Sequence, residues 1–233
     1  MKKILLALIT LVSLTQAQEI YATFNVEAYK SANLAFTASG LVKSTYAKIG
    51  DHVQKEKILA SLDNDDIKAL LERAKTNYKY AKKAYKRELK IKNLIDEGKF
   101  DIVAKTYENA KNTLLYQQAM YNKTFLKAPF DGVIFYKDIE TGDAVSGLML
   151  KTVYKIQSKS KRKLLVTFDE KYATVVKVGD IFTYSVDGDS KVYNGKINKI
   201  YPLANSKNRK VTAEVQANGF MVGLFGTGTI HTK

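Results

Sequence analysis

Few residues of this chain stand in a pattern that could carry out catalysis. A transfer or hydrolytic enzyme needs a nucleophile, a base and a group that orients the base. His52 lies inside a predicted turn and His231 lies close to the end of the chain, while Ser146 lacks the G-x-S-x-G setting of a serine nucleophile. The carboxylates of Asp169 and Glu170 fall at a predicted turn, where solvated caps are the ordinary explanation. We therefore expect that the protein is not an enzyme.

Metal and cofactor motifs are equally sparse. The acidic run DNDD (63–66) lacks the glycine and the distal glutamate of a calcium loop. The methionines after the first residue fall in three different predicted modules and no cysteine accompanies them, which disfavours a soft-metal site; they are Met120, Met149 and Met221. GLFGTG (223–228) has glycines loosely spaced as in dinucleotide loops, but it precedes a strand pattern rather than a helix. We expect no cofactor and no bound metal.

Composition and the first residues indicate an exported, basic protein. The chain has 233 residues and a formal net charge of +15, which favours anionic surfaces as partners. MKKILLALITLVSLTQA (1–17) has the lysines, short apolar run and small residues of a secretory signal, so nucleic acid is the least expected partner. Retention of this segment as an anchor is the alternative to cleavage. The chain has no cysteine, so its stability must come from packing without disulfides.

A helical period occupies the middle of the chain. Apolar residues recur in steps of three and four from Ile67 to Tyr85 and again from Phe100 to Phe125, as in the seam of a coiled coil. Asp63, Asn64 or Asp65 can cap the first helix. DEGK (96–99) separates the two stretches, so a short glycine turn should make the helices antiparallel. The first proline, Pro129, follows them. Residues 65–126 are therefore predicted to form a helical hairpin.

Two similar strand segments flank this predicted hairpin. IGDHV (49–53) and TGDAV (141–145) lie 92 residues apart, and six positions keep the same spacing: Gly40 and Gly132, Val42 and Ile134, Gly50 and Gly142, Asp51 and Asp143, Val53 and Val145, and Ile58 and Leu150. Each copy predicts a strand, a turn at Gly-Asp and another strand. Since an isolated strand hairpin is marginal in water, the two copies should fold against each other as a small sandwich.

This arrangement resembles a lipoyl/biotinyl fold split by a helical hairpin, as in the periplasmic adaptor (membrane fusion, HlyD-like) proteins of efflux pumps. Residues 39–63 are similar to the first lipoyl half and residues 126–156 to the second, with APFDG (128–132) as the most specific signature. The lysine that carries the cofactor in lipoyl carriers is missing. In such adaptors Gly40, Gly50, Asp51, Gly132, Gly142 and Asp143 would form the lipoyl-like turns.

A β-barrel module is expected after the second half. Alternation at Leu164, Val166 and Phe168 and at Ile181, Thr183 and Ser185 predicts half-buried strands. By resemblance, Asp169-Glu170, Gly179-Asp180 and Gly195 fall at its turns. The full expectation is a mixed β and α, elongated protein: signal peptide 1–17, N-terminal strands 18–38 joining the barrel or a membrane-proximal remnant, lipoyl-like half 39–64, helical hairpin 65–126, second half 127–157, and β-barrel 158–233 with a truncated membrane-proximal end.

At the hairpin tip, the family carries an arginine, a leucine and a serine that dock on a partner. These positions fall on Lys90, Leu94 and Asp101, of which only the leucine is kept. Lysine keeps the charge without the planar fork of arginine, and aspartate would cap the second helix as serine does. Ordinary turn and cap residues are the alternative interpretation.

Two functions remain open from the sequence. The first is a non-catalytic adaptor, trimeric or hexameric in the assembled pump, between an inner-membrane transporter of the resistance-nodulation-division type and an outer-membrane channel. It would be periplasmic in a Gram-negative bacterium and held at the membrane by its partners. The second is a soluble periplasmic scaffold or binding protein whose basic stalk holds anionic wall polymer or lipid headgroups.

Overall fold

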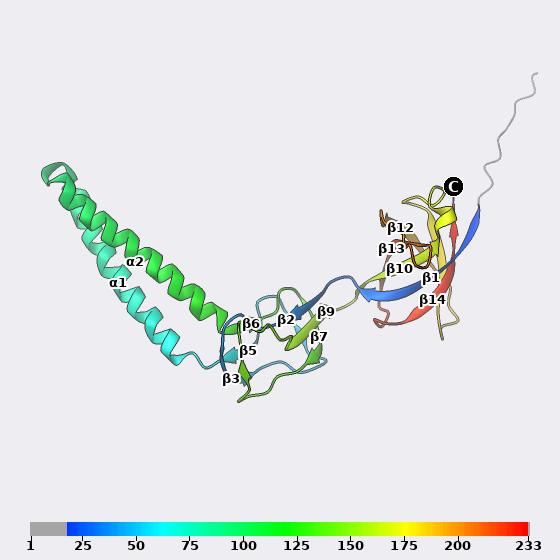
Figure 1. Ribbon diagram of the computed structural model, residues 1–233, viewed down its shortest axis with the longest axis horizontal. Coiled ribbons are helices and arrows are strands. Elements are labelled where there is room, and N and C mark those ends of the chain that lie inside the picture. The colour runs from blue at the N-terminus through cyan, green and yellow to red at the C-terminus, as the bar shows by residue number, and fades with distance from the viewer. Residues whose placement is uncertain (1–17, 233) are drawn as a thin grey trace, which may run out of the picture. The chain divides into compact units, whose positions relative to one another are not determined.

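The computed structural model describes residues 18–232 (Figure 1), so the predicted signal at 1–17 lies outside the described residues. The described chain forms two compact units. One consists of the residues up to Tyr29 together with those from Ser160 on, and the other is Lys30–Lys159. Among the described helices, none combines the length and the apolar character that crossing a membrane requires.

The first unit is a closed antiparallel barrel. Around the barrel its strands follow the order β1 (Glu19–Ala28), β10 (Lys161–Asp169), β13 (Lys210–Asn218), β12 (Tyr193–Ile200), β11 (Ile181–Val186) and β14 (Phe225–His231). A short 3₁₀ helix, η2 (Glu170–Tyr172), follows β10. β1 pairs with both β10 and β14, so strands from the two ends of the chain close the barrel and leave no free sheet edge. The ring of Phe24 meets those of Phe182 and Tyr184 edge-on in its core, at centroid distances of 5.8 and 5.2 Å.

Two sequence expectations within the barrel need correction. Leu164, Val166 and Phe168 are buried as predicted, but in β11 the inward residues are Phe182, Tyr184 and Val186 rather than 181, 183 and 185. In β11 both sets of alternate residues could face the core as far as the sequence shows, and only packing against the neighbouring strands decides which set is buried. Gly195 lies inside β12, not at a turn, and a Cβ there would clash with Cγ1 of Val215.

The second unit contains a sandwich of two four-stranded sheets. One has the order β2 (Ser31–Leu34), β9 (Tyr154–Ser158), β7 (Gly132–Lys137) and β4 (His52–Val53); the other has the order β6 (Phe125–Lys127), β5 (Ile58–Leu62), β3 (Gly40–Thr45) and β8 (Ala144–Val145). The N-terminal segment 18–38 is shared between the two units. β1 joins the barrel, whereas β2 pairs with β9, because Ala32 and Leu34 pack on the sandwich core.

The two halves exchange strands across the sandwich. The Gly50 amide donates to the Ile134 carbonyl at 2.8 Å, and the Ile134 amide donates to the Asp51 carbonyl at 3.1 Å. The second Gly-Asp turn makes the same two bonds: the Gly142 amide donates to the Val42 carbonyl at 2.9 Å, and the Val42 amide donates to the Asp143 carbonyl at 2.8 Å. Each Gly-Asp turn is therefore bonded to a strand of the other half, and Val53 and Val145 pack on the same core.

Each Gly-Asp turn is also closed by its own side chain. Oδ2 of Asp51 accepts from the Lys48 amide, and Oδ2 of Asp143 accepts from the Glu140 amide, both at 2.8 Å. Gly50 and Gly142 have φ of 92° and 96°, in the left-handed region that glycine tolerates. The barrel contains a third copy at Gly179-Asp180, whose carboxylate accepts from the Lys177 amide at 2.8 Å.

The 92-residue register does not extend to the last predicted pair. The Tyr46 amide donates to the Leu59 carbonyl, whereas its counterpart Asp138 donates to Val153, so the spacing has grown to 94. Two additional residues in the second copy cause this change. Leu150, predicted to match Ile58, is consequently outside any strand and 67% exposed. Gly40 and Gly132 begin β3 and β7, so they are strand residues rather than turn residues.

Two long helices leave the sandwich between β5 and β6. They are α1 (Asp65–Lys90) and α2 (Glu97–Lys123), with the 3₁₀ helix η1 (Lys92–Leu94) between them, and they run side by side in Figure 1. Stacked rings join them, with the centroid of Tyr107 lying 5.7 Å from Tyr78 and 4.8 Å from Tyr85. We name α1, α2 and the segment between them the helical hairpin.

The helix ends differ from the predicted ones. Gly98 lies in the first turn of α2, because Asp96 caps that helix by accepting from the Lys99 amide at 3.1 Å. α2 ends at Lys123, and Phe125 belongs to β6. Asn64 is the first cap residue, but its side-chain amide donates instead to Oγ1 of Thr124 at 2.8 Å. This bond ties together the two chain segments at the base of the hairpin.

Replacing Gly50 with alanine tests the role of the Gly-Asp turn. No atom lies within 4 Å of the added Cβ, so the cost is the backbone conformation itself, about 1–2 kcal/mol. Native-state hydrogen exchange of the Ile134 amide should show this loss. Gly98→Ala is the matched control and should leave exchange in the sandwich unchanged, because Gly98 lies in a helix. Equal effects of the two changes would contradict our assignment of the turn.

A buried tyrosine makes the sandwich sensitive to alkali. The hydroxyl of Tyr154 donates to the carbonyls of Ala47 and Leu59 at 3.0 and 3.3 Å. Burial, with smaller effects from the carboxylates of Glu140 and Asp51, raises the pKa of Tyr154 from 10.0 to about 12. The folded state therefore holds the phenol proton more tightly than the unfolded chain does. Stability is fully present below pH 10 and is lost as the pH rises toward 12.

The Tyr154→Phe variant tests this pH dependence. At neutral pH it should be less stable than the unmodified chain by about 1 kcal/mol, because the single hydroxyl proton, which the carbonyls of Ala47 and Leu59 share, is lost as a hydrogen-bond donor. Between pH 10 and 12 the difference in unfolding free energy should shrink, since only tyrosine releases a proton on unfolding. Urea unfolding at several pH values measures this difference, and a constant difference from pH 9 to 12 would refute the prediction.

Candidate partner-binding site

The far end of the helical hairpin is a compact turn. The Leu94 amide donates to the Ile91 carbonyl at 2.8 Å, which forms η1, and Asp96 then starts α2. Below the turn, Phe100 is buried against the ring of Tyr85, and Nζ of Lys92 stands 4.9 Å from the centroid of the Phe100 ring. The aromatic packing of the two helices thus continues to the end of the hairpin and supports the turn.

The predicted docking residues occupy different places at this end. Lys90 is the last residue of α1, and Leu94 lies in η1 with 85% of its surface exposed. Both line a hollow of about 410 Å³ with residues 89–94. Asp101 is exposed inside α2 and does not line this hollow. It does not cap the helix either, because Asp96 starts α2 five residues earlier.

Sequence reasoning missed two apolar neighbours of Leu94. Leu89 and Ile91 line the same hollow and are 48% and 41% exposed. Their signal was an apolar residue on each side of Lys90, outside the helical seam. Together with Leu94 they form an apolar surface at the end of the hairpin, and Lys90 and Lys92 line the same hollow. We name residues 89–94 the tip.

The first helix of the hairpin is strongly basic. Residues 65–93 contain ten basic and four acidic residues. Nζ of Lys79 and Nζ of Lys83 lie 5.9 and 5.6 Å from the centroid of the Tyr80 ring, and Nζ of Lys82 lies 5.4 Å from that of Tyr78. These exposed cation–π contacts are individually weak, but they hold ammonium groups along the helix surface.

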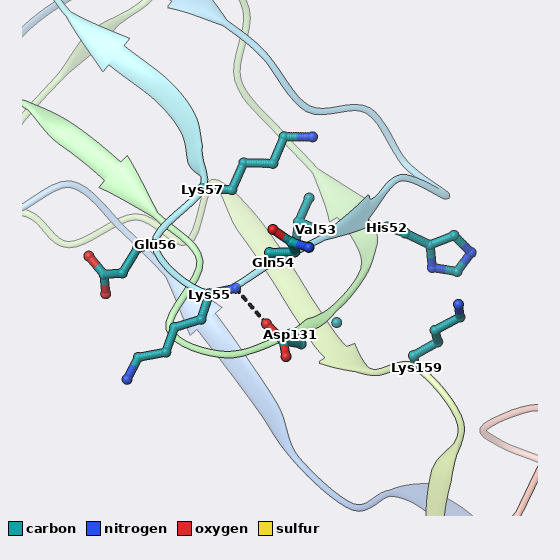
Figure 2. Close-up of a pocket in the computed structure, with 9 residues that line it drawn as sticks. His52, Val53, Gln54, Lys55, Glu56, Lys57, Asp131 and Lys159 are labelled. Atoms are coloured by element: carbon teal, nitrogen blue, oxygen red, sulfur yellow. Dashed lines mark hydrogen bonds between the residues drawn. The ribbon is translucent and has the colours of Figure 1, made fainter.

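A second hollow lies at the loop that connects β4 and β5 of the sandwich (Figure 2). It measures about 690 Å³ and residues 52–57 line it together with Asp131, Gly132 and Lys159. Oδ1 of Asp131 accepts from the Lys55 amide at 2.7 Å, and the Glu56 carboxylate pairs with Lys127 at 3.3 Å. Both carboxylates thus have structural partners, and the hollow has the mixed charge of a solvated surface.

The histidines and methionines considered for catalysis or metal binding belong to different elements of the two units. His52 is in β4 of the sandwich, whereas Nε2 of His231 in the barrel is 3.1 Å from Oγ1 of Thr183. Met120 is in α2, Met149 is in the loop after β8, and Met221 precedes β14. Within residues 18–232, no group of three histidine, cysteine or acidic residues is placed to hold a metal ion.

Solved structures share this architecture. A crystal structure of a MacA-MexA chimera with the α-hairpin domain of Pseudomonas aeruginosa MexA has a TM-score of 0.82, 20% identity and coverage of 93% of this chain and 80% of that one. A putative efflux transporter from Bacteroides eggerthii gives 0.71, 20%, 92% and 69%, and MacA from Actinobacillus actinomycetemcomitans gives 0.70, 20%, 93% and 79%. At these identities the likeness shows the fold.

The family follows from the sequence match. No curated protein matches the chain. The family model of the CzcB-like barrel-sandwich hybrid domain matches residues 30–157, which is more than half of the chain and contains both sandwich halves and the helical hairpin. The protein therefore belongs to this family, the non-enzymatic periplasmic adaptor or membrane fusion proteins.

Proposed function

We propose that this protein is the periplasmic adaptor of a tripartite efflux pump. It would link an inner-membrane transporter, of the resistance-nodulation-division type, to an outer-membrane channel. One observation carries this proposal: a sandwich that folds from two halves holds a long helical hairpin with an exposed leucine, Leu94, at its end. The adaptor role of the family and the fold shared with an efflux-related structure support it.

The tip is the proposed channel contact. Leu94 is 85% exposed, Leu89 and Ile91 line the same hollow, and Lys90 and Lys92 lie beside them. An apolar centre that is surrounded by polar groups is the usual composition of a protein contact. The tip turn is supported from below by Phe100, so its shape exists before a partner arrives, which lowers the entropy lost on binding. Lys90 would add a charged contact, and Asp101 would lie at the margin.

The remaining parts have assigned places in the proposal. Export through residues 1–17 would deliver the chain to the periplasm of a Gram-negative bacterium. Three or six copies would stand around the transporter, with the barrel and the sandwich as the parts that touch it. The adaptor would supply a path and mechanical coupling, while the transporter supplies energy. The exported substrate would be selected by the transporter.

The Leu94→Asp variant tests the tip. A buried carboxylate in an apolar contact costs several kcal/mol, so crosslinking of the tip to the channel should fall by on the order of a hundredfold, with resistance to exported toxic compounds lost. Fold and expression should be unchanged, because Leu94 is exposed. Leu115→Asp is the matched control: Leu115 is 61% exposed on the same hairpin but far from the tip. Normal efflux in the Leu94 variant would contradict the proposal.

One observation favours a second candidate function. The exposed lysines of α1 form a basic surface along a helix, which would suit a periplasmic scaffold that holds anionic wall polymer or lipid headgroups. This function needs the charge of α1 and does not need Leu94. The two proposals therefore make opposite predictions for the two parts of the same hairpin.

A double charge reversal tests the second function. Lys79→Glu with Lys83→Glu should weaken salt-dependent retention on polyphosphate by on the order of tenfold or more, because each lysine near an anionic surface contributes about 1 kcal/mol. The same change at Lys207 and Lys210 of the barrel is the control for net charge, since both are exposed. If both double variants lose retention equally, the basic surface of α1 is not a specific binding surface.

A further inference from the structure

One end of the barrel gathers both ends of the described chain. β1 starts there and β14 finishes there, with Glu19 paired with His231. The loop between β10 and β11 lies at the same end, and so does the loop between β12 and β13, because Asp169 pairs with Lys210. The arrow of β14 points toward this end in Figure 1. The segment 1–17, with the sequence of a signal or an anchor, therefore joins the described chain at this end of the barrel.

These two loops, residues 170–180 and 201–210, carry a surplus of positive charge. They contain two acidic residues and five basic ones, which are Lys171, Lys177, Lys207, Arg209 and Lys210. The carboxylate of Asp180 is buried and accepts from a backbone amide of its own loop, and that of Glu170 lies 3.9 Å from Nε of Arg209. The Glu170 amide also donates to the Arg209 carbonyl at 3.0 Å, so the two loops are bonded to each other. We name them the basic end of the barrel.

Most ammonium groups at the basic end have no carboxylate partner. Within residues 18–232, the side chains of Lys177, Lys207 and Lys210 form no ion pair. Nζ of Lys171 stands 4.9 Å from the centroid of the Tyr172 ring, which leaves its charge uncompensated as well. Uncompensated charges of one sign on neighbouring loops attract an anionic surface. The partner of this end should therefore be negatively charged.

Each loop of the basic end also has one inner and one outer apolar residue. In the first loop Val176 is buried in the barrel core, whereas Val178 is 62% exposed. In the second loop Ala204 packs against the core, whereas Leu203 is 82% exposed. The inner residues cover the core, so burial does not account for the choice of valine and leucine at the outer positions. Exposed apolar residues of this kind indicate a contact surface.

The opposite end of the barrel provides a comparison. Its loops, residues 187–192 and 219–224, contain two acidic residues and one basic residue. Val192 and Met221 are 67% and 73% exposed there. Exposed apolar side chains therefore occur at both ends, whereas the surplus of positive charge accompanies them at the basic end and not at the opposite one. A partner of the basic end must satisfy both features.

An anionic lipid surface fits this combination. Apolar side chains enter the boundary between headgroups and acyl chains, while lysines lie along it with their ammonium groups at the phosphates. The core of a protein contact is instead depleted of charged residues, and here Val178 and Leu203 stand on separate loops that each carry basic residues. The position of segment 1–17 agrees with a lipid surface, since an anchor that is retained would hold the basic end next to the bilayer.

We propose that the basic end of the barrel binds the anionic lipid of the inner membrane directly, with Val178 and Leu203 at the headgroup boundary. The inference rests on the proposed export to the periplasm, and it adds a lipid contact to an adaptor that its protein partners hold at the membrane. A single weak membrane signal gives reversible binding, and stable attachment needs a second one. The basic end therefore orients the barrel on the bilayer and does not by itself anchor the chain.

The absence of cysteine from the sequence makes a local test direct. The single change Leu203→Cys carries a polarity-sensitive fluorophore on the full chain, and vesicles of phosphatidylglycerol and phosphatidylethanolamine are added. The fluorescence should shift to the blue and become protected from acrylamide, a neutral quencher in the water. Adding Lys171→Glu with Lys177→Glu should weaken the apparent affinity by on the order of tenfold or more, because each lysine near anionic lipid strengthens binding. Met221→Cys is the matched control at the opposite end and should stay open to acrylamide.

Three results would overturn the inference. The first is a Leu203→Cys fluorophore that is not protected, or is protected no more than that of Met221→Cys. The second is an affinity that the two lysine changes leave unaltered. The third is protection by inner-membrane vesicles but not by protein-free lipid, which would assign the basic end to a protein partner.

The Leu94→Asp change separates this inference from the proposed function. It should leave the protection of the Leu203→Cys fluorophore unchanged, because Leu94 belongs to the other unit. Protection together with normal efflux in the Leu94 variant would keep the lipid contact and reject the channel-docking role of the tip. Loss of efflux in that variant without any protection at the basic end would keep the adaptor function and reject the lipid contact.

Discussion

The structure of the second unit depends on the reciprocal exchange of backbone hydrogen bonds between its halves. Gly50 and Asp51 bond to Ile134, while Gly142 and Asp143 bond to Val42. Neither strand pair could bury its apolar face alone, whereas together they enclose one core that contains Leu62, Ile134 and Ile156. Each of these turns requires a residue in the left-handed conformation, which glycine supplies. The same Gly-Asp turn occurs at Gly179-Asp180 in the barrel, where the pair bonds to Ile197.

This exchange also explains how the fold accepts a helical hairpin of about sixty residues. The hairpin leaves after β5 and returns into β6, and these strands are paired, with Ala60 opposite Leu126. The two ends of the insertion are therefore about one strand spacing apart, near 5 Å, whatever the length of the helices. The bond between Asn64 and Thr124 fixes this junction. Hairpin length can vary without changing the sandwich, which suits a part that must reach a partner.

The comparison between equivalent halves separates what folding requires from what it leaves free. Glycine at the turns, the Asp side-chain bonds and the buried aliphatic positions are shared by both halves. The exposed apolar residues 148–150 and the charged residues 56–57 are not shared, although equivalent hydrogen bonds, from the Lys55 amide to Asp131 and from the Gly147 amide to Ser39, hold the start of both loops. The tip has the same status: the Leu94 side chain is 85% exposed, whereas Phe100 below it is buried against Tyr85.

The sequence by itself determined the repeat, the helical period and the Gly-Asp turns, because each is a local pattern with a direct physical cause. It also placed the two helices, since the steps of three and four residues reflect the period of a helix. Only the tertiary structure decided that β2 pairs in the sandwich, that Phe182 and not Ile181 faces the barrel core, and that Gly98 lies within a helix. These outcomes depend on the elements against which each strand or helix end packs. The two additional residues that displace Leu150 could be recognised only from the hydrogen bonds that fix the register. The exposure of Leu148, Met149 and Leu150 was likewise a tertiary result, because an apolar run in a sequence does not show whether it faces the core or the solvent.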